Sequence, residues 1–305
     1  MKSSSSVSVK RCRPMLGTYV IVTVKGTNER WAGLAAERAF QAVEKVQQLM
    51  SAHEPHSDLG RITRSGAYEP LEVHLWTHQV LGLAQKVSLL SQGTFDVMVG
   101  GRLEQSGFLP RFKEPTRSSD STYADLDLLP GSRVMLRRPC RLDLGGIAKG
   151  FAVDKAVEAA LQGPGVQAVT VNAGGDIRIQ ADRPQELWLR DPFRPEFFWQ
   201  GGLVTSGSFA SSGGVNALRD SKHGLAAPLL CPGQKRPPRR TPGVLVAATT
   251  CAVADALTKV VGLAQPHLAR RVVGEFGAKA WVARPGEAYR ELTPSHHRKV
   301  GEDAR

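Results

Sequence analysis

Cysteine is scarce in this chain, and long apolar runs are absent from it. The four cysteines, Cys12, Cys140, Cys231 and Cys251, are widely spaced and form no Cys-x-x-Cys pair. The pattern predicts reduced thiols, with neither a disulfide framework nor a zinc site. The N-terminal residues are rich in serine and then basic, without the apolar core of a secretory signal. No run is long enough to span a membrane. We therefore expect a cytoplasmic protein without a membrane span.

Acidic residues are also in short supply, with 28 against 40 lysines and arginines and a formal net charge of +12. Such an excess favours a polyanionic ligand or an acidic partner. The basic residues are dispersed, and the densest clusters, at residues 235–240 and 296–299, are typical of a solvated loop and a tail. We therefore predict no nucleic-acid partner.

The apolar periodicity indicates a mixture of helices and strands. Helices are predicted over residues 31–50, 75–90, 151–161 and 253–263, and strands over residues 19–24, 168–171, 177–179 and 244–248, with a short strand ending at Leu142. Because the two kinds of element do not alternate strictly, an α+β fold is expected rather than a doubly wound sheet. The hydrophobic content of 41% over 305 residues suffices for a substantial core.

The composition of the two ends differs from that of the rest of the chain. We expect a flexible tail over residues 1–13, one mixed domain over residues 14–290 and a basic tail over residues 291–305. The segment 231–243 is rich in glycine, proline and arginine, and it predicts a long loop within the domain.

Residues 143–154 carry the strongest chemical signal. They combine a strand end, a turn at Gly145 and Gly146, and a helix start that contains Lys149. Glycines let backbone N–H groups approach an anion, the helix N-terminus is positive, and the lysine adds a full charge. Neither the P-loop spacing nor the dinucleotide fingerprint is present. Two interpretations are open from these residues: a phosphate site, or a tight helix entry with a solvated lysine.

Several other segments accompany this turn. They are Met15-Leu16-Gly17-Thr18, Phe95-Asp96-Val97, Asn172-Ala173-Gly174-Gly175-Asp176, the expected polar turn Thr205-Ser206-Gly207, and an apolar helix start with Asp255 in its first turn. In this order, they resemble the ApbE family of flavin transferases, which move FMN from FAD onto a serine or threonine of a target protein. The resemblance implies a single α+β domain of the ApbE type and a transferase activity that releases AMP.

The resemblance also implies a site. A magnesium ion would neutralise the FAD pyrophosphate, held by the carbonyl of Gly146, by Asp255 and by Thr258. The residues implied to bind FAD are Met15, Thr94, Phe95, Asp96, Asp143, Lys149 and Leu230. Other roles are open for four residues. Met15 and Phe95 could pack in the core, Asp255 could be a first-turn carboxylate that stabilises the positive end of the helix dipole, and Asp176 could support the Gly-Gly turn.

Among the positions that depart from the family pattern, two bear on the base and on the metal. The family's catalytic histidine corresponds to Pro228 here, and the nearest histidine, His223, reaches the site as a general base only if its loop is reshaped. The family's hydroxyl ligand, four residues after the aspartate, corresponds to Lys259. The neighbouring Thr258 points about 100° away on a helix, so either Lys259 replaces part of the cation charge or a shifted register lets Thr258 bind the metal.

The function predicted from the sequence is a magnesium-dependent FAD:protein FMN transferase acting on a Ser or Thr of an acidic target flavoprotein. The missing histidine keeps two alternatives open: a non-catalytic FAD-binding protein and an FAD pyrophosphatase. In-line phosphoryl transfer depends mainly on positioning and charge neutralisation, so the loss of a base slows the reaction rather than forbidding it.

Overall fold

A computed structural model describes residues 6–110, 120–222, 224–230, 238 and 240–292. Its main sheet is antiparallel, with strand order β1-β2-β6-β7-β8-β9-β10-β11. The strands are β1 (Val7–Met15), β2 (Thr18–Gly26), β6 (Val166–Ala173), β7 (Asp176–Arg190), β8 (Phe198–Ser212), β9 (Gly243–Ala248), β10 (Lys279–Ala283) and β11 (Arg290–Glu291). A smaller sheet has the order β3-β5-β4, with β3 (Leu71–Glu72), β4 (Leu126–Leu129) and β5 (Arg133–Leu136).

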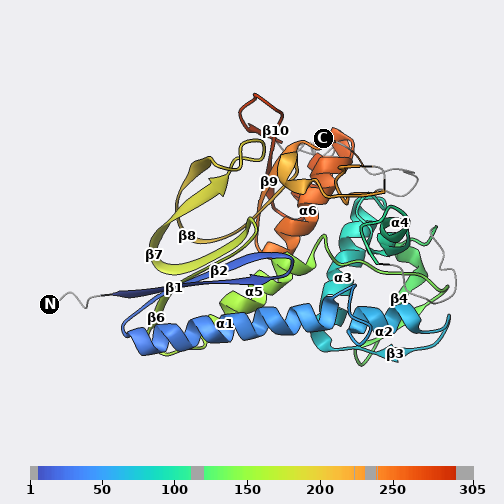
Figure 1. Cartoon of the computed structure of the whole chain (residues 1–305), viewed down its shortest axis with the longest axis horizontal. Coiled ribbons are helices and arrows are strands. Elements are labelled where there is room, and N and C mark those ends of the chain that lie inside the picture. The colour runs from blue at the N-terminus through green and yellow to red at the C-terminus, as the bar shows by residue number, and fades with distance from the viewer. Residues whose placement is uncertain (1–5, 111–119, 223, 231–237, 239, 293–305) are drawn as a thin grey trace, which may run out of the picture.

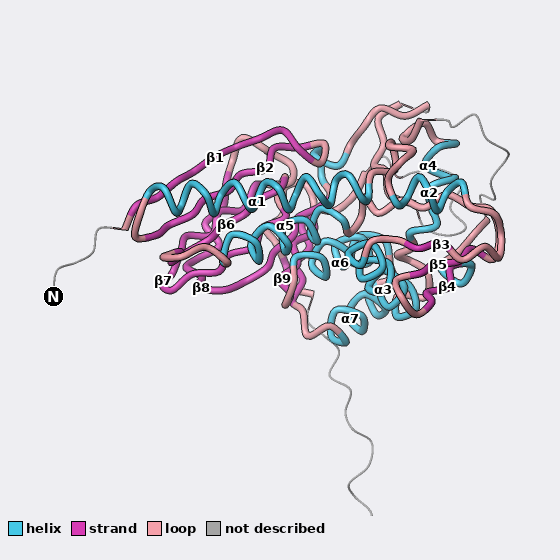
Figure 2. The backbone as a smooth tube through the Cα atoms, turned by 90° about the horizontal axis from the view of Figure 1, so that it is seen from below, coloured by secondary structure: helices cyan, strands magenta, loops and turns pink. Residues whose placement is uncertain are grey.

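Some of the helices lie against the main sheet, and others lie beside the small one (Figure 1). They are α1 (Glu29–Met50), α2 (Asp58–Arg64), α3 (Leu75–Leu90), α4 (Gly100–Gln105), α5 (Ala148–Leu161), α6 (Cys251–Leu263) and α7 (Pro266–Glu275), with short 3-10 turns η1 (Val97–Val99), η2 (Tyr123–Asp125) and η3 (Gly214–Ala217). The long helix α1 runs from the main sheet to α2 beside the small sheet, and α5 lies alongside it (Figure 2).

Small buried residues explain the close packing of these helices. Helix α1 begins at a cap in which the Asn28 side chain accepts a hydrogen bond from the backbone of Trp31. Its buried face is mostly alanine and valine, and α5 presents the same residue types. Helices with such faces approach closely, and their side chains join one large hydrophobic cluster with α3, α6 and the strands of the main sheet.

The α+β fold is confirmed, and all the predicted helices exist. The strands predicted around residues 19–24, 168–171, 177–179 and 244–248 are β2, β6, β7 and β9. No helix among the described residues is apolar and long enough to cross a bilayer.

Three sequence predictions about local structure are wrong. Most of the expected N-terminal tail belongs to the edge strand β1. Much of this strand is exposed to solvent, so its sequence lacks the regular alternation of apolar and polar residues that indicates a strand. The Thr205-Ser206-Gly207 segment lies inside β8 and is not a turn. Leu142 ends no strand, because residues 140–144 are irregular backbone that buries Cys140, Leu142 and Leu144 in the core.

The C-terminal boundary also differs from the prediction. Strand β11 crosses the expected start of the basic tail, and the backbone N–H of Leu292 donates to Ala280. Residues 1–5 and 293–305 of the two expected tails, and residues 231–237 and 239 of the expected loop, lie outside the described residues.

Candidate functional site

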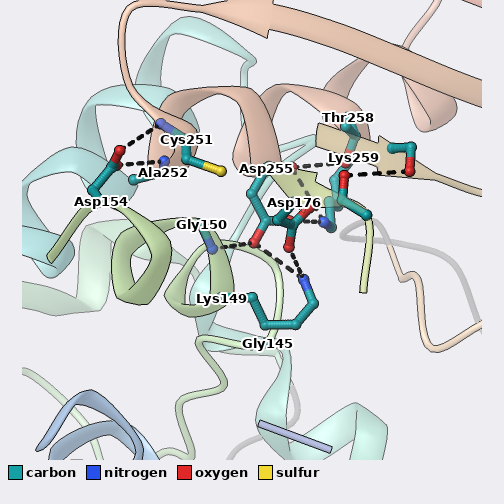
Figure 3. Close-up of polar contacts among 12 residues, drawn as sticks. Gly145, Lys149, Gly150, Asp154, Asp176, Cys251, Ala252, Asp255, Thr258 and Lys259 are labelled. Carbon is teal, nitrogen blue, oxygen red and sulfur yellow. Dashed lines mark hydrogen bonds and ion pairs between the residues drawn. The ribbon is translucent and has the colours of Figure 1, made fainter. Parts of the chain in front are cut away.

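Three segments far apart in the sequence meet at the start of α5. They are the glycine turn before Ala148, the β6–β7 hairpin and helix α6 (Figure 3). Helix α5 touches α6 at Gly150, where an added Cβ would overlap the carbonyl oxygen of Cys251 and lie 2.8 Å from the Cβ of Asp255. The absence of a side chain at Gly150 therefore lets its backbone N–H donate to the Asp255 carboxylate over 3.1 Å.

The β6–β7 hairpin aims a carboxylate at the same point. Gly174 and Gly175 have φ angles of 64° and 106°, which glycine adopts without strain, and they form the two-residue turn. The Asn172 side chain accepts a hydrogen bond from the Gly175 backbone at 2.9 Å. Because Asn172 holds the turn, the Asp176 carboxylate is left to accept from the ammonium of Lys149 at 2.6 Å. The alternative role of Asp176 as a turn support is therefore not what the geometry shows.

The carboxylate of Asp255 is the centre of the cluster. Its Oδ2 accepts from Lys149 at 3.2 Å as well as from Gly150, and its Oδ1 accepts from Lys259. The Lys259 ammonium also donates to the backbone carbonyl of Asp255 at 3.1 Å. Two lysines and two aspartates, Lys149, Lys259, Asp176 and Asp255, thus form a continuous charge cluster under the glycine turn.

The cluster shifts the pKa values of its members in opposite directions. Burial, together with the charge of Asp255, raises the pKa of Asp176 to about 6. Burial acts in the same direction on Asp255, but Lys149 and Lys259 outweigh it and lower the pKa of Asp255 to about 2. Burial opposes the charge of Lys149, yet Asp176 and Asp255 raise its pKa above the usual value. Near neutral pH, Lys149 and Asp255 are therefore both ionised.

A second buried acid fixes the position of α6. Asp154 on α5 accepts hydrogen bonds from the backbone N–H groups of Cys251 and Ala252, each at 2.9 Å, and pairs with Arg178 at 2.8 Å. Burial raises the pKa of Asp154. Helix α6 begins at Cys251, so Asp255 does not lie in its first turn. The backbone N–H groups at the N-terminus of α6 donate instead to the Asp154 carboxylate and to the Thr250 side chain, which caps the helix. The dipole interpretation of Asp255 is therefore wrong.

Of the residues predicted to bind FAD, Phe95 and Asp143 lie at the glycine turn. The ring of Phe95 reaches within 3.2 Å of the place of a Cβ on Gly146. The Asp143 carboxylate accepts from the Gly145 backbone at 3.1 Å, and burial raises its pKa. Asp96 is buried, and both of its oxygens accept backbone hydrogen bonds, from Met98 and Tyr123, so it organises the loop after Phe95.

The other predicted positions lie around this centre or apart from it. Met15 ends β1 at a turn whose Thr18 lies against Gly174, so it is next to the β6–β7 hairpin. The half-buried Thr94 belongs to the turn that precedes Phe95, where its N–H donates to Ser91. Leu230 is buried in a separate small cluster with Val99, Leu103 and Leu109. His223 lies outside the described residues.

The described residues do not fit the predicted magnesium site. Both carboxylate oxygens of Asp255 already accept from lysines or from Gly150. The Thr258 hydroxyl is buried and donates to the backbone carbonyl of Asp255 at 2.7 Å. Within the described ranges, no three or more His, Cys, Asp and Glu side chains are grouped so as to hold a metal ion. Mg²⁺ requires several oxygen ligands, and the Lys259 ammonium already binds the Asp255 carboxylate that would be one of them.

The sequence singled out Asp255, Lys149 and Gly146 as site residues but missed part of the charge cluster that the structure forms around Asp255. It gave Asp176 no place in the site and Asp154 no role at all. The signal for Asp176 was its position directly after a Gly-Gly turn, where a strand begins and alternate side chains face the helix layer. Nothing in the local sequence marks Asp154 as the cap of a helix that begins 97 residues later.

Comparisons with known proteins show the family to which this chain is similar. A family model described as the ApbE family matches residues 16–281. A curated relative from Rhodobacter capsulatus, named FAD:protein FMN transferase, is 29% identical over 227 residues, which cover 70% of this chain and 43% of the relative. A relative of the same name from Vibrio cholerae is 28% identical over 162 residues, which cover 48% of each chain. The matched residues thus span less than half of the length of either relative.

Solved structures share the fold. The crystal structure of the ApbE protein from Thermotoga maritima has a TM-score of 0.75 and 24% identity, and the match covers 93% of this chain and 97% of that one. The flavin transferase ApbE from Vibrio cholerae has a TM-score of 0.77 and 20% identity, over 95% of this chain and 98% of that one. At such identities the likeness establishes the architecture.

Proposed function

Since this chain belongs to the ApbE family, we propose that it is an FAD:protein FMN transferase. The observation that carries the proposal is the charge cluster of Lys149, Lys259, Asp176 and Asp255, which puts two ammonium groups beside a glycine turn at a helix N-terminus. Such an arrangement is suited to the pyrophosphate of a dinucleotide. The names of the relatives from Rhodobacter capsulatus and Vibrio cholerae support transfer over FAD storage or FAD hydrolysis.

The proposed reaction is an in-line displacement at phosphorus. The hydroxyl oxygen of a Ser or Thr on the acceptor flavoprotein bonds to the phosphorus of the FMN half of FAD. The bond from that phosphorus to the bridging oxygen breaks, AMP leaves with the electron pair, and the hydroxyl proton passes to solvent. The lysines contribute by neutralising the pyrophosphate charge, which is the main requirement of such a step.

The remaining predicted contacts are part of this proposal. Phe95 and Asp143 flank the glycine turn and are proposed to contact the flavin nucleotide, with Met15 and Thr94 further out. Asp96 is proposed to support FAD binding indirectly, by holding the loop after Phe95 in place. Leu230 is proposed to do so by packing in the small apolar cluster with Val99, Leu103 and Leu109. A general base is typically worth ~10²–10⁴-fold, so transfer without the family histidine is expected to be slow but measurable.

No step of the proposal passes through a metal, because the described residues do not fit Mg²⁺. An acidic acceptor is proposed from the net charge of +12. The cytoplasmic location remains a prediction from the sequence.

The test is to incubate the purified chain with FAD and candidate acceptor flavoproteins. AMP release would be followed by chromatography, and the acceptor would be examined by mass spectrometry after denaturation. Covalent FMN on a Ser or Thr, together with AMP, would support the proposal. A Lys149→Met variant gives the matched negative control.

Two results would overturn the proposal. AMP and FMN released in equal amounts, with no labelled acceptor, would identify a pyrophosphatase. Tight FAD binding without AMP in the presence of every acceptor would identify a non-catalytic flavin-binding protein.

A further inference from the structure

The Lys259 side chain lies between Gly146 and Asp255, two of the three residues that the sequence predicts as metal ligands. Its Cγ and Cε lie 3.7 and 3.6 Å from the place of a Cβ on Gly146. Its ammonium donates to both the carboxylate and the backbone carbonyl of Asp255, one helical turn earlier (Figure 3). The geometry points to Lys259 as the built-in cation of this site, which takes the place of a divalent ion and binds the FAD pyrophosphate together with Lys149.

Charge balance supports this assignment. The ammonium groups of Lys149 and Lys259 offset the carboxylates of Asp176 and Asp255, so the cluster has no excess negative charge to attract a divalent cation. A metal ion would have to displace the Lys259 ammonium from Asp255, and the displaced ammonium would keep its charge beside the metal. Two cations held next to each other repel strongly where water is excluded.

The exposure of the four side chains shows which charges a ligand meets. The side chains of Asp255 and Asp176 are 0% and 3% exposed, whereas those of Lys259 and Lys149 are 13% and 30% exposed. Each ammonium donates two hydrogen bonds within the cluster, and an ammonium has three donors. The surface facing the ligand is therefore cationic, with the balancing carboxylates behind it.

This inference rests on the proposed function for its ligand, FAD, but not for its cation chemistry. In the first experiment, Mn²⁺ would be titrated into the full chain and its binding followed by electron paramagnetic resonance. The wild-type protein is expected to bind Mn²⁺ no better than an Asp255→Asn variant. A Lys259→Ser variant frees the Asp255 carboxylate and adds a hydroxyl, so it is expected to gain affinity by about tenfold or more. The double variant Lys259→Ser with Asp255→Asn should lose that gain.

The second experiment measures FAD affinity by flavin fluorescence, with EDTA or with Mg²⁺. The wild-type affinity is expected to be equal in both. Lys259→Ser should bind about tenfold more weakly in EDTA and recover in Mg²⁺, since the ion replaces the lost charge. Lys259→Arg keeps a cation and should stay independent of Mg²⁺, and thermal unfolding would confirm that each variant is folded.

Two results would overturn the assignment. One is wild-type Mn²⁺ binding that Asp255→Asn abolishes, and the other is a wild-type FAD affinity that Mg²⁺ raises about tenfold. The first result counts only where thermal unfolding shows that Asp255→Asn is folded. The second is read on the wild-type chain alone, so a variant that fails to fold leaves that test intact. If the protein binds no FAD under either condition, the proposed function fails, while the Mn²⁺ titration still decides the role of Lys259.

Discussion

The carboxylate of Asp176 lies 2.6 Å from the ammonium of Lys149, although 27 residues separate them in the chain. This pair joins the first residue of β7 to the first turn of α5. It also fixes which side of the glycine turn carries the lysine charge. The chemistry of the site thus depends on how the hairpin packs against the helix, and this packing can be tested.

The pH dependence of FAD binding should report on Asp176. Its pKa of about 6 is raised by burial and by Asp255, whereas Asp255, with a pKa of about 2, stays ionised. Lowering the pH from about 7.5 to about 5 protonates Asp176, and the site gains positive charge. FAD should then bind more tightly, by up to about tenfold. Asp176→Asn should bind equally well at both pH values, and weaker binding of the wild type at acid pH would contradict the assignment.

Removing the Lys149 charge should weaken FAD binding strongly. Lys149→Met leaves Asp176 and Asp255 facing the pyrophosphate, and the loss of a charged hydrogen-bond donor is expected to lower the affinity about 10²-fold. Flavin fluorescence titration measures the change. Lys155→Met, on the same helix but paired with Glu158, is the matched control and should bind like the wild type.

Stability should depend strongly on Asp255. Asp255→Asn leaves the ammonium groups of Lys149 and Lys259 without their shared carboxylate, and the free energy of unfolding should fall by about 3 kcal/mol. Urea denaturation at neutral pH measures it. Asp127→Asn, which breaks the exposed pair with Arg137 at 2.8 Å, is the control and should lose less than about 1 kcal/mol.

The same carboxylate should contribute to acid sensitivity. Because the pKa of Asp255 is lowered to about 2 in the folded chain, its contribution to stability is present above the unfolded value of 3.8. That contribution is lost as the pH falls from there toward 2, when the carboxyl becomes protonated. Wild-type stability that stays constant relative to Asp255→Asn through this window would refute the expectation.

The contact between α5 and α6 should tolerate no side chain at Gly150. Gly150→Ala places a Cβ on the backbone of Cys251, so the helices must separate, and the free energy of unfolding should fall by about 3 kcal/mol. Gly262→Ala on α6 is the matched control. Its Cβ would meet only Val244, at 3.8 Å, and should stabilise the chain by about 0.5–1 kcal/mol. Urea denaturation compares the two, and equal effects would show that the contact is not tight.

Elements with strong local patterns could be predicted from the sequence. Helix α3 was predicted at the bounds that the structure shows, because its apolar residues follow the helical period and the residues that flank it, His74 and Ser91, are polar. The glycine turn was evident from the adjacent pair Gly145-Gly146, which Lys149 follows by three residues. Strand β1 was missed because an edge strand exposes much of its surface, and the Thr205-Ser206-Gly207 segment of β8 because small polar residues resemble a turn.

Which charges share the site depends on the packing of elements that are distant in the sequence. The local sequence shows that Lys259 follows Asp255 by one helical turn. It does not show that the Lys259 ammonium forms an ion pair with the Asp255 carboxylate, where a metal ion was predicted. Nor does it show that Asn172 holds the hairpin while Asp176 pairs with Lys149. These choices depend on the contact of α5 with α6 at Gly150 and on the register of β6 with β7, because electrostatic partners are set by distance in space and not by separation along the chain.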